Sequence, residues 1–379
     1  MRYCKTCLSP DTRPNASFNE HGICIACSYS EASRDIAYES RLKELRGIVQ
    51  RLTKRRKYQE YDCIVGVSGG KDSTRQALWV REKLGLHPLL VCVSYPPKQV
   101  SQVGVDNLSN LISQGFDCIM LGPAPQTSRD LMREAFFRYT NVFRATEMVL
   151  FAGVPKMAVA HDIKLILWGE NPALQVGDSG SLGESIWDGN NIRNLNTLAG
   201  GALDWMIETV GRPENILPYQ FPDVALMREK MINTVFLGPA WSNWSISENS
   251  AFAMPEGLHI RSEGVSSTGD LMGTSMLDEE WATINMMLKY YKLGFGRASD
   301  YVNEEIRAQR LTRSEGAVLV KRYDGICDDK YVESFCRYVS ITVDAFWSQV
   351  AKAASPVLFE SVPGLQRPQP LFTPGVDRE

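Results

Sequence analysis

The residues of this chain with the clearest chemistry form one short stretch, Ser68-Gly69-Gly70-Lys71-Asp72-Ser73. An apolar run, residues 62–67, precedes it and a helix-like string, residues 75–80, follows it, which predicts a strand, a glycine turn and a helix. Such a turn leaves backbone N–H groups free at a helix N-terminus, where the macrodipole adds positive charge and glycine lets an oxyanion come close. Lys71 adds a full charge, and Asp72 can hold a cation. The stretch therefore predicts a phosphate-binding site.

The spacing of this stretch differs from the commonest phosphate-binding pattern. The Walker pattern needs four residues between its first glycine and Gly-Lys-Ser/Thr, and that spacing is absent here. The stretch instead resembles the pyrophosphate loop of the PP-loop ATPases, which implies that the chain binds ATP, transfers AMP to a carbonyl oxygen and releases pyrophosphate. The alternative is a Gly-Gly turn that only joins a strand to a helix. We favour the PP-loop because the residues match in order within a strand-turn-helix context.

Four cysteines near the N-terminus have the spacing of a metal site. Cys4-x2-Cys7 and Cys24-x2-Cys27 are separated by sixteen residues, and two such turns are typical of a tetrahedral zinc site with four thiolates. The stretch between them has too little apolar content to fold around a core, so metal binding would supply the folding energy. Redox-active pairs or an iron–sulfur cluster are the alternatives. We favour structural Zn²⁺ because the spacing is that of a zinc knuckle.

Composition and charge narrow the class of protein. The chain has 379 residues, 44% hydrophobic and 22% charged, as in ordinary globular proteins with room for two domains. The formal charge of −3 makes nucleic acid an unlikely partner, and the basic run of residues 54–57 is interpreted as a solvated helix end. No apolar stretch is long enough to span a bilayer, no signal-peptide core is present, and nine cysteines, an odd number, favour reduced thiols. We expect a cytoplasmic protein without a membrane span.

The elements that would position these residues alternate between strand and helix patterns. Apolar runs predict strands at residues 63–67, 88–95, 116–121 and 163–170, and the helices predicted between them lie at residues 73–84, 105–114 and 128–139. This pattern predicts an α/β fold with a buried parallel sheet. Ligands bind at the carboxyl ends of parallel strands, so the segments that follow the strands should face one crevice. These segments are residues 68–73, 94–97, 122–123 and 169–171.

The segment after the fourth strand is the second candidate site. Gly169 admits close approach, while Glu170 and Asn171 offer a carboxylate and an amide to Mg²⁺ or a polar substrate. The structural alternative is a helix start, with Asn171 as N-cap and Pro172 at the first helical position, and both can hold together. Residues 177–201, rich in Gly, Asn, Asp and Ser, predict an ordered binding loop or a mobile lid.

The chain is expected to have five parts. These are a zinc knuckle at residues 1–30, a linking amphipathic helix at 31–59, a PP-loop ATP-binding domain at 60–240, an irregular and mostly helical region at 241–355, and a proline-rich tail at 356–379. The tail is expected to be extended along the surface or disordered. Helices are expected in the fourth part at residues 279–293, 299–309, 314–323 and 330–354. Between the first two, the junction Gly294-Phe295-Gly296-Arg297 is suited to aim an arginine at an anion. A helix C-cap followed by an N-cap explains the same residues.

Taken together, four motifs resemble the N-acetyl sugar amidotransferases of bacterial surface-glycan synthesis, including lipopolysaccharide O-antigen and pseudaminic-acid-type sugars. They are the cysteine knuckle, residues 61–73, Gly169-Glu170-Asn171-Pro172-Ala173-Leu174 and Gly294-Phe295-Gly296-Arg297-Ala298-Ser299-Asp300. The resemblance runs from residue 1 to about residue 325, and it implies an adenine nucleotide alpha hydrolase-like domain. Where the family pattern has threonine and histidine, this chain has Ser299 and Tyr301, which leaves the role of position 301 in substrate choice open.

The resemblance implies a reaction and its participants. ATP with Mg²⁺ would adenylate the oxygen of an acetamido group on a nucleotide-linked or related sugar, and ammonia would displace AMP to leave an acetamidino group. A separate glutaminase or synthase-like subunit is the expected ammonia source. The residues expected to carry this chemistry are Lys71, Asp72 and Glu170 for catalysis, Ser68, Gly69, Gly70, Lys71, Asp72, Ser73, Ser94 and Gly169 for ATP, Asn171, Arg297 and Asp300 for the substrate, and Cys4, Cys7, Cys24 and Cys27 for zinc.

Two other functions fit parts of the sequence. A tRNA-modifying PP-loop enzyme, acting by thiolation or lysidine-type ligation, also pairs cysteine knuckles with such a loop. Against it stand the acidic balance and the lack of a second catalytic cysteine pair, since the later cysteines are scattered singly, at Cys92, Cys118, Cys327 and Cys336. A zinc-dependent scaffold that binds nucleotide without turnover would not need Lys71 and Asp72. Release of AMP separates this scaffold from an enzyme.

Overall fold

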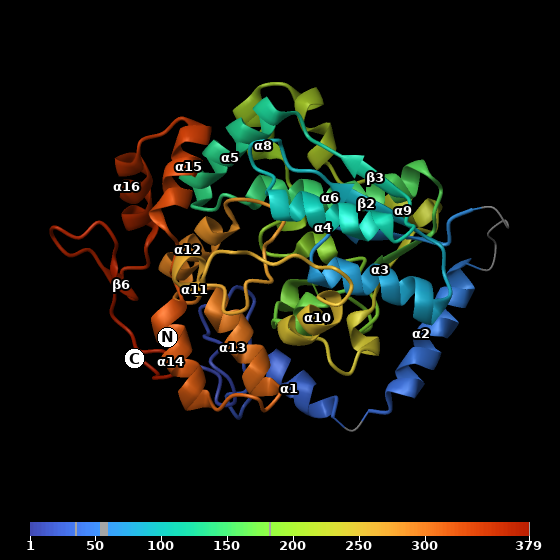
Figure 1. Cartoon of the computed structure of the whole chain (residues 1–379), viewed down its shortest axis with the longest axis horizontal. Helices are drawn as coiled ribbons and strands as arrows, with labels where there is room; N and C mark the ends of the chain where they lie inside the picture. The colour runs from blue at the N-terminus through green and yellow to red at the C-terminus, as the bar shows by residue number, and fades with distance from the viewer. Residues whose placement is uncertain (35, 54–59, 182, 379) are drawn as a thin grey trace.

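A five-stranded parallel sheet forms the centre of the molecule (Figure 1). The structure is a computed structural model and describes residues 1–34, 36–53, 60–181 and 183–378. In spatial order the strands are β3 (Cys118–Leu121), β2 (Pro88–Val93), β1 (Cys63–Val67), β4 (Leu165–Trp168) and β5 (Asn233–Phe236). Every pairing is parallel, so the carboxyl ends of the strands lie at one edge. The expected α/β fold with a buried parallel sheet is confirmed.

Helices cover both faces of this sheet. Three cover one face, and these are α2 (Tyr38–Thr53), α3 (Lys71–Leu84) and α4 (Gln102–Ser113). They bury Leu45, Leu78 and Leu111 against the strands. The opposite face is covered by α6 (Arg144–Ala160), which follows α5 (Pro125–Tyr139). Helix α6 was not predicted from the sequence. Burial on both faces explains why these strands are continuous apolar runs and not alternating patterns.

The linking helix predicted at residues 31–59 is present as α2, but it begins at Tyr38 and not at residue 31. The chain forms α1 (Ile25–Ala32) and then α2, with a break between them. The two helices have different packing partners, because α1 buries Ala26 and Cys27 in the knuckle whereas α2 packs on the sheet. One straight helix cannot serve both surfaces. The basic run of residues 54–57 lies outside the described residues.

The C-terminal region is mostly helical, as expected. It contains α10 (Ile246–Ala253), α11 (Val265–Thr268), α12 (Ala282–Leu293), α13 (Arg297–Arg307), α14 (Arg313–Tyr323), α15 (Asp329–Val339) and α16 (Val343–Ala353). The single helix predicted at residues 330–354 is therefore two helices. Ser340 ends the first with φ of 56°, and the Thr342 side chain caps the second. The short helices α7 (Pro172–Gln175), α8 (Asp204–Val210) and α9 (Val224–Glu229) precede this region. The domain boundaries stay predictions.

The N-terminal knuckle lies against the C-terminal region, far away in sequence (Figure 1). Its cysteines and Leu8 form one apolar cluster with Val302 and Ile306 of α13 and Val320 of α14. The Leu8 backbone N–H donates to Asn303 Oδ1 at 2.7 Å. The knuckle is therefore part of the support of α13 and not an isolated appendage.

The tail after residue 356 is ordered, so the disordered alternative is wrong. Leu358 and Phe359 are buried in the core of the C-terminal helices. β6 (Phe359–Glu360) pairs antiparallel with β7 (Gln369–Pro370), and Asp377 accepts a hydrogen bond from the Tyr3 backbone at 2.8 Å. Apolar side chains at the start of the tail thus anchor it despite its prolines.

Among the described residues, no helix combines the length and the apolar character needed to cross a bilayer.

Candidate active site

The glycine loop joins β1 to α3 as the sequence predicts. Gly69 has φ of 85°, and a Cβ there would lie 2.5 Å from the backbone nitrogen of Leu108, so only glycine fits. Ser73 Oγ accepts from the Ser68 N–H at 3.3 Å and donates to the Gly70 carbonyl at 3.1 Å, which fixes the turn. No side chain caps α3. Its first N–H groups are therefore available to an oxyanion.

Lys71 and Asp72 form an ion pair directly after this turn. Lys71 Nζ lies 2.7 Å from Asp72 Oδ2, and Asn249 Nδ2 of α10 donates to Asp72 Oδ1 at 2.6 Å. Burial opposes ionisation of Asp72, but the charge of Lys71, its hydrogen bond and the Asn249 amide together hold the pKa of Asp72 below its ordinary value. An exposed lysine is expected from a loop pattern, yet the Lys71 side chain is buried. Its charge is therefore directed into a cavity and not into open solvent.

Residues from four segments that are distant in sequence line a central cavity of about 200 Å³, and residues 244–249 form one of these segments. Lys71 and Asp72 come from the glycine loop, Glu170 from the end of β4 and Arg297 from the start of α13. Glu170 is accessible from the cavity, but the surrounding protein, and then the negative charge of Asp72, raise the pKa of Glu170 to about 7. The expected convergence of Glu170 and Arg297 on the glycine loop is therefore present. Their roles stay predictions.

The glycine junction before α13 is both a helix boundary and a means of aiming Arg297. Gly294 ends α12 with φ of 77°, and the Asp324 carboxylate accepts from the Gly296 N–H at 2.8 Å. Arg297 Nη2 donates to Ser275 Oγ, while its buried Nε has no hydrogen-bond partner among the described residues. A buried donor without a partner is costly. Arg297 is therefore suited to receive an oxygen acceptor from a ligand.

Asp300, the other α13 residue predicted to bind substrate, is already engaged. Its carboxylate lies 2.6 Å from Arg13 Nη2 and 2.7 Å from Lys289 Nζ. Burial alone would raise the pKa of Asp300, but Lys289 and then Arg13 hold it well below its usual range. Asp300 thus links the knuckle residue Arg13 to the wall of the central cavity.

Gly169 and Asn171 have structural roles that the sequence also allowed. A Cβ at Gly169 would lie 2.1 Å from Gln76 Oε1. Asn171 is the N-cap of α7, where its side chain accepts from the Leu174 N–H at 3.4 Å and donates to the Ile186 carbonyl at 2.9 Å. The Asn171 side chain is therefore occupied, and its contact with a substrate stays a prediction.

Ser68 and Ser94 line a second, apolar cavity of about 240 Å³ at the ends of β1 and β2. The single crevice expected from the strand ends is therefore two cavities, with the glycine loop contributing to both. Most of the lining is aliphatic, with Val93, Val100, Leu108, Ile112 and Met120 among its residues. The sequence analysis missed Asp278, which also lines this cavity and accepts from Tyr95 Oη at 2.9 Å.

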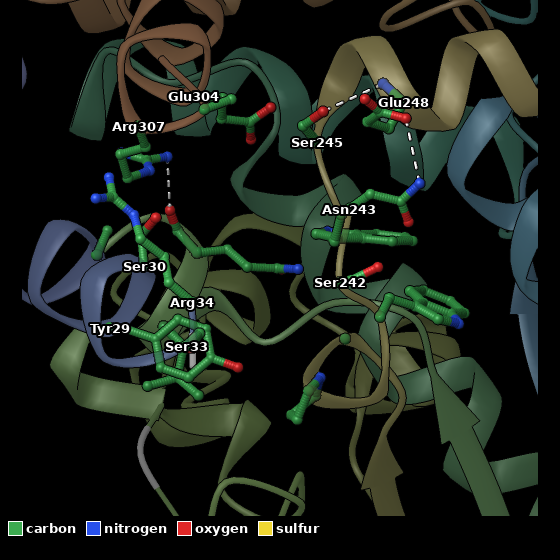
Figure 2. Close-up of a pocket in the computed structure, with 18 of the residues that line it drawn as sticks. Tyr29, Ser30, Ser33, Arg34, Ser242, Asn243, Ser245, Glu248, Glu304 and Arg307 are labelled. Carbon is green, nitrogen blue, oxygen red and sulfur yellow. Dashed lines mark hydrogen bonds between the residues drawn. The ribbon is translucent and has the colours of Figure 1, made fainter. Parts of the chain in front are cut away.

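A larger cleft of about 540 Å³ lies beside the central cavity and was also missed (Figure 2). It separates the knuckle side, with Tyr29 and Arg34, from the segment that carries Asn243 and Glu248, while Arg307 of α13 completes the wall. The cleft and the central cavity share Gln175, Trp244, Ser245 and Glu304 as lining residues. No local motif predicts this cleft, because four separate parts of the chain form it.

The four knuckle cysteines form a group suited to a metal ion. Their sulfur atoms lie within 4.8 Å of one another and all four residues are buried. Cys7 Sγ accepts from the Ser9 N–H and Cys4 Sγ from the Cys24 N–H, each at 3.3 Å, and such bonds stabilise thiolates. The group therefore fits a four-thiolate metal site. The identity of the metal as zinc stays a prediction.

Replacing Cys24 with serine is expected to remove one equivalent of zinc per chain and to unfold the knuckle while leaving the sheet largely intact. Because α13 packs on the knuckle, activity should also fall. Metal analysis, far-UV circular dichroism and thermal melting check this. The matched control is Cys336→Ser, a buried cysteine in the C-terminal helices. Iron or no metal in the wild-type protein would contradict the prediction.

The C-terminal part of the chain matches the model of a known protein family. Residues 274–368 match the family described as LPS biosynthesis protein WbpG-like, C-terminal domain. Residues 274–368 are called the WbpG-like domain below, after the family model that they match. This match supports the family resemblance drawn from the sequence. No curated protein matches the chain.

Two solved structures are similar to parts of this chain. The NH3-dependent NAD synthetase from Campylobacter jejuni has 16% identity and a TM-score of 0.28, with 52% of this chain and 94% of that chain covered. The U34-tRNA thiolase NcsA from Methanococcus maripaludis, with its [4Fe-4S] cluster, has 13% identity and a TM-score of 0.32, with 85% and 89% covered. Because both TM-scores are below 0.5, we base no argument on either structure.

The WbpG-like domain supplies residues to the central cavity, the apolar cavity and the cleft. Asp278 lines the apolar cavity, Arg297 and Asp300 line the central cavity, and Arg307 lines the cleft. The other lining residues come from the sheet region, the knuckle and the segment between residues 238 and 249. The site is therefore complete only when the WbpG-like domain is packed on the sheet.

Replacing Arg297 with lysine is expected to lower kcat/KM for the sugar substrate by about 10- to 100-fold while ATP binding stays nearly unchanged. Lysine keeps the charge but loses the planar fork that binds an oxyanion with two hydrogen bonds. Steady-state kinetics and calorimetric binding of ATP measure the two effects. Arg322→Lys, an exposed position on α14, is the control. A kinetically silent Arg297→Lys enzyme would reduce the junction to a helix boundary.

Proposed function

We propose that the protein is an ATP-dependent, AMP-forming amidotransferase that converts an acetamido group of a nucleotide-linked or related sugar into an acetamidino group. One observation carries the proposal. Lys71 and Asp72 of the glycine loop meet Glu170 and Arg297 in one cavity, so a phosphate site, a titratable carboxyl and a second cation lie together. The WbpG-like domain supports a role in surface-glycan synthesis.

The two cavities suit the two ends of ATP. The glycine loop and Lys71 would hold the phosphates, since N–H groups and a buried cation converge there. The apolar cavity would hold the adenine ring, which needs flat apolar surroundings. The carboxylate of Asp72 is a hard oxygen donor facing the central cavity, so it fits Mg²⁺, which would neutralise phosphate charge when bound.

The reaction would proceed in two displacements. The amide oxygen of the acetamido group attacks the α-phosphorus of ATP and pyrophosphate leaves, which gives an O-adenylated imidate. Ammonia then adds to the imidate carbon, and AMP leaves with its oxygen while the acetamidino group forms. Lys71 would stabilise the pyrophosphate charge. Glu170, with a pKa near 7, is suited to accept the proton that the attacking nitrogen loses.

The proposal also covers the source of ammonia, the compartment of the reaction and the role of the knuckle metal. Because ammonia is mostly ammonium at neutral pH, a glutaminase or synthase-like partner subunit would supply it. The reaction would take place in the cytoplasm, where ATP is available. The metal in the knuckle would be structural zinc, because the knuckle packs against α13 and, within the described residues, contributes Arg13 alone to the ion pairs of the site.

The direct test is incubation of the purified protein with ATP, Mg²⁺, ammonium and a panel of acetamido nucleotide sugars. We expect AMP and pyrophosphate in equal amounts, together with a sugar product in which an oxygen atom is replaced by an NH group in the mass spectrum. Omission of ammonium should prevent formation of that product. Release of ADP, or AMP formation that depends on tRNA and not on sugar, would contradict the proposal.

A further inference from the structure

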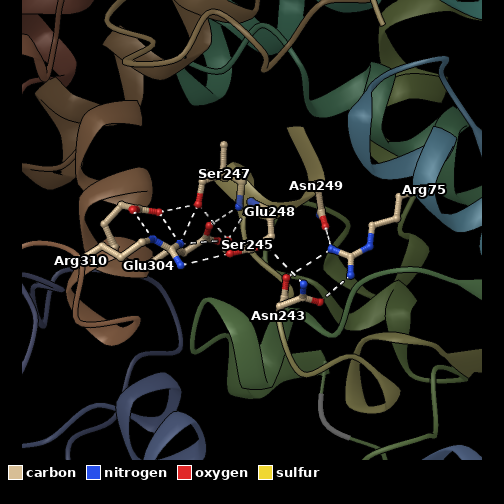
Figure 3. A network of polar contacts seen from close by, with 10 residues as sticks. Arg75, Asn243, Ser245, Ser247, Glu248, Asn249, Glu304 and Arg310 are labelled. Carbon is tan, nitrogen blue, oxygen red and sulfur yellow. Dashed lines mark hydrogen bonds and ion pairs between the residues drawn. The ribbon is translucent and has the colours of Figure 1, made fainter. Parts of the chain in front are cut away.

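The carboxylate of Asp72 is held from behind by a row of hydrogen-bonded side chains that leads away from the glycine loop. Figure 3 shows the part of this row that runs from Asn249 through Arg75 to Asn243. Asn249 Nδ2 donates to Asp72 Oδ1 at 2.6 Å. Arg75 Nη1 donates to Asn249 Oδ1 at 2.6 Å, and Arg75 Nη2 donates to Asn243 Oδ1 at 2.6 Å. Asn249 and Arg75 are both buried. Arg75 therefore donates in both directions along this row of side chains, toward the glycine loop through Asn249 and toward the cleft through Asn243.

Arg75 determines which way the Asn249 amide points. A guanidinium can only donate, so Asn249 must offer its oxygen to Arg75 and its NH₂ group to Asp72. Arg75 itself is enclosed by Trp241, Trp244 and Phe252, with its guanidinium carbon 5.2 to 5.8 Å from the ring centroids. The acceptors of its hydrogen bonds among the described residues are amide and carbonyl oxygens. The rings and these oxygens leave Arg75 little freedom to move.

The same chain continues to the cleft. Asn243 Nδ2 donates to Glu248 Oε2 at 3.2 Å, and Glu248 Oε1 lies 3.2 Å from Nη1 of Arg310 in the turn between α13 and α14. Asn243, Glu248 and Arg310 all line the cleft. The orientation of Asp72 is therefore connected through four side chains to the wall beside the WbpG-like domain.

We propose that Asn249 and Arg75 are positioning residues that set the orientation of the Asp72 carboxylate toward Mg²⁺ and phosphate. This inference rests on the proposed function of the glycine loop. Both residues are proposed to act through Asp72, since Asn249 bonds its carboxylate and Arg75 bonds Asn249. Asn249 acts by fixing one oxygen of Asp72 with a charge-assisted hydrogen bond, and Arg75 acts one step further back by fixing the amide.

The test uses the full chain and measures how much Mg²⁺ is needed for binding of α,β-methylene-ATP, followed by calorimetry. Asn249→Leu removes the donor to Asp72 and the acceptor for Arg75 and adds no charge. The Mg²⁺ concentration for half-maximal binding should rise by about 10- to 100-fold. Arg75→Lys should give a smaller change in the same direction, because lysine cannot bridge two amides. The matched control is Ser250→Ala, the next residue on α10, whose hydroxyl bonds Ile246 O and Thr274 Oγ1.

A double-mutant cycle separates positioning from general damage. In the Asp72→Ala background, Asn249→Leu should have no further effect on the Mg²⁺ requirement, because its route of action is gone. Equal effects in both backgrounds, or an equal effect of Ser250→Ala, would overturn the proposal. If Asn249→Leu does not fold, Asn243→Ala removes the other amide that holds Arg75, and an unchanged Mg²⁺ requirement there would overturn it. A wild-type protein that binds the analogue with Mg²⁺ but never forms AMP would refute the proposed function and leave this inference standing.

Discussion

Replacing Lys71 with methionine is expected to lower the rate of AMP formation by about 10²- to 10³-fold, because the variant loses a preorganised cation where pyrophosphate charge develops. Methionine fills much of the same buried space. The remaining cost to folding is the lost hydrogen bond to Asp72, which is about 1–3 kcal/mol. Rapid-quench measurement of AMP and urea unfolding monitor the two quantities separately.

The control for Lys71→Met is Lys83→Met, which changes an exposed lysine near the other end of α3. Its AMP formation should equal that of the wild type. An active Lys71→Met enzyme would exclude the assignment of the loop to phosphate binding. A rate that falls only in proportion to the unfolded fraction would mean that Lys71 serves folding.

Replacing Glu170 with glutamine is expected to lower kcat/KM by about 10²-fold and to flatten its pH dependence. In the wild type, kcat/KM should rise with pH up to about 7, because Glu170 is protonated below the raised pKa and cannot accept a proton. Glutamine removes this titration. A set of pH profiles from 5.5 to 8.5 on wild type and variant measures the difference.

The same group should also affect folding stability. Glu170 holds its proton more tightly in the folded protein, where its pKa is about 7, than at its ordinary value of 4.5. Its contribution to the free energy of unfolding must therefore decline as pH rises between these values. Glu170→Gln should remove that decline, whereas Glu229→Gln, an exposed position on α9, should not. A wild-type pH profile that is flat near 7 would contradict both expectations.

Much of the fold follows from local patterns. The parallel sheet is predictable because Val- and Ile-rich runs alternate with helices, and the glycine loop because its geometry depends on its own residues. β5 escapes prediction because four residues are too few to show a period. The break at Ser340 has only one local signal, the capping Thr342, and the apolar pattern runs through it.

The residues of the candidate site could also be predicted only in part from the sequence. Glu170 follows from the rule that ligands bind at strand ends, whereas Arg297 depends on the family resemblance. Asp278 and Asn249 could not be found from sequence, because their importance arises from contacts with residues more than 170 positions away. Asn171 shows the reverse case, since a pattern that suits a ligand is used by a helix cap.

The contact between the knuckle and α13 sets an order of events during synthesis. The cysteines leave the ribosome first, but the α13 and α14 residues that cover them are made about 270 residues later, roughly 15–55 s at ordinary elongation rates. During that interval the thiols have no packing partners from the WbpG-like domain. A metal ion captured early would protect them from oxidation and hold the nascent knuckle in shape until the domain arrives to cover it.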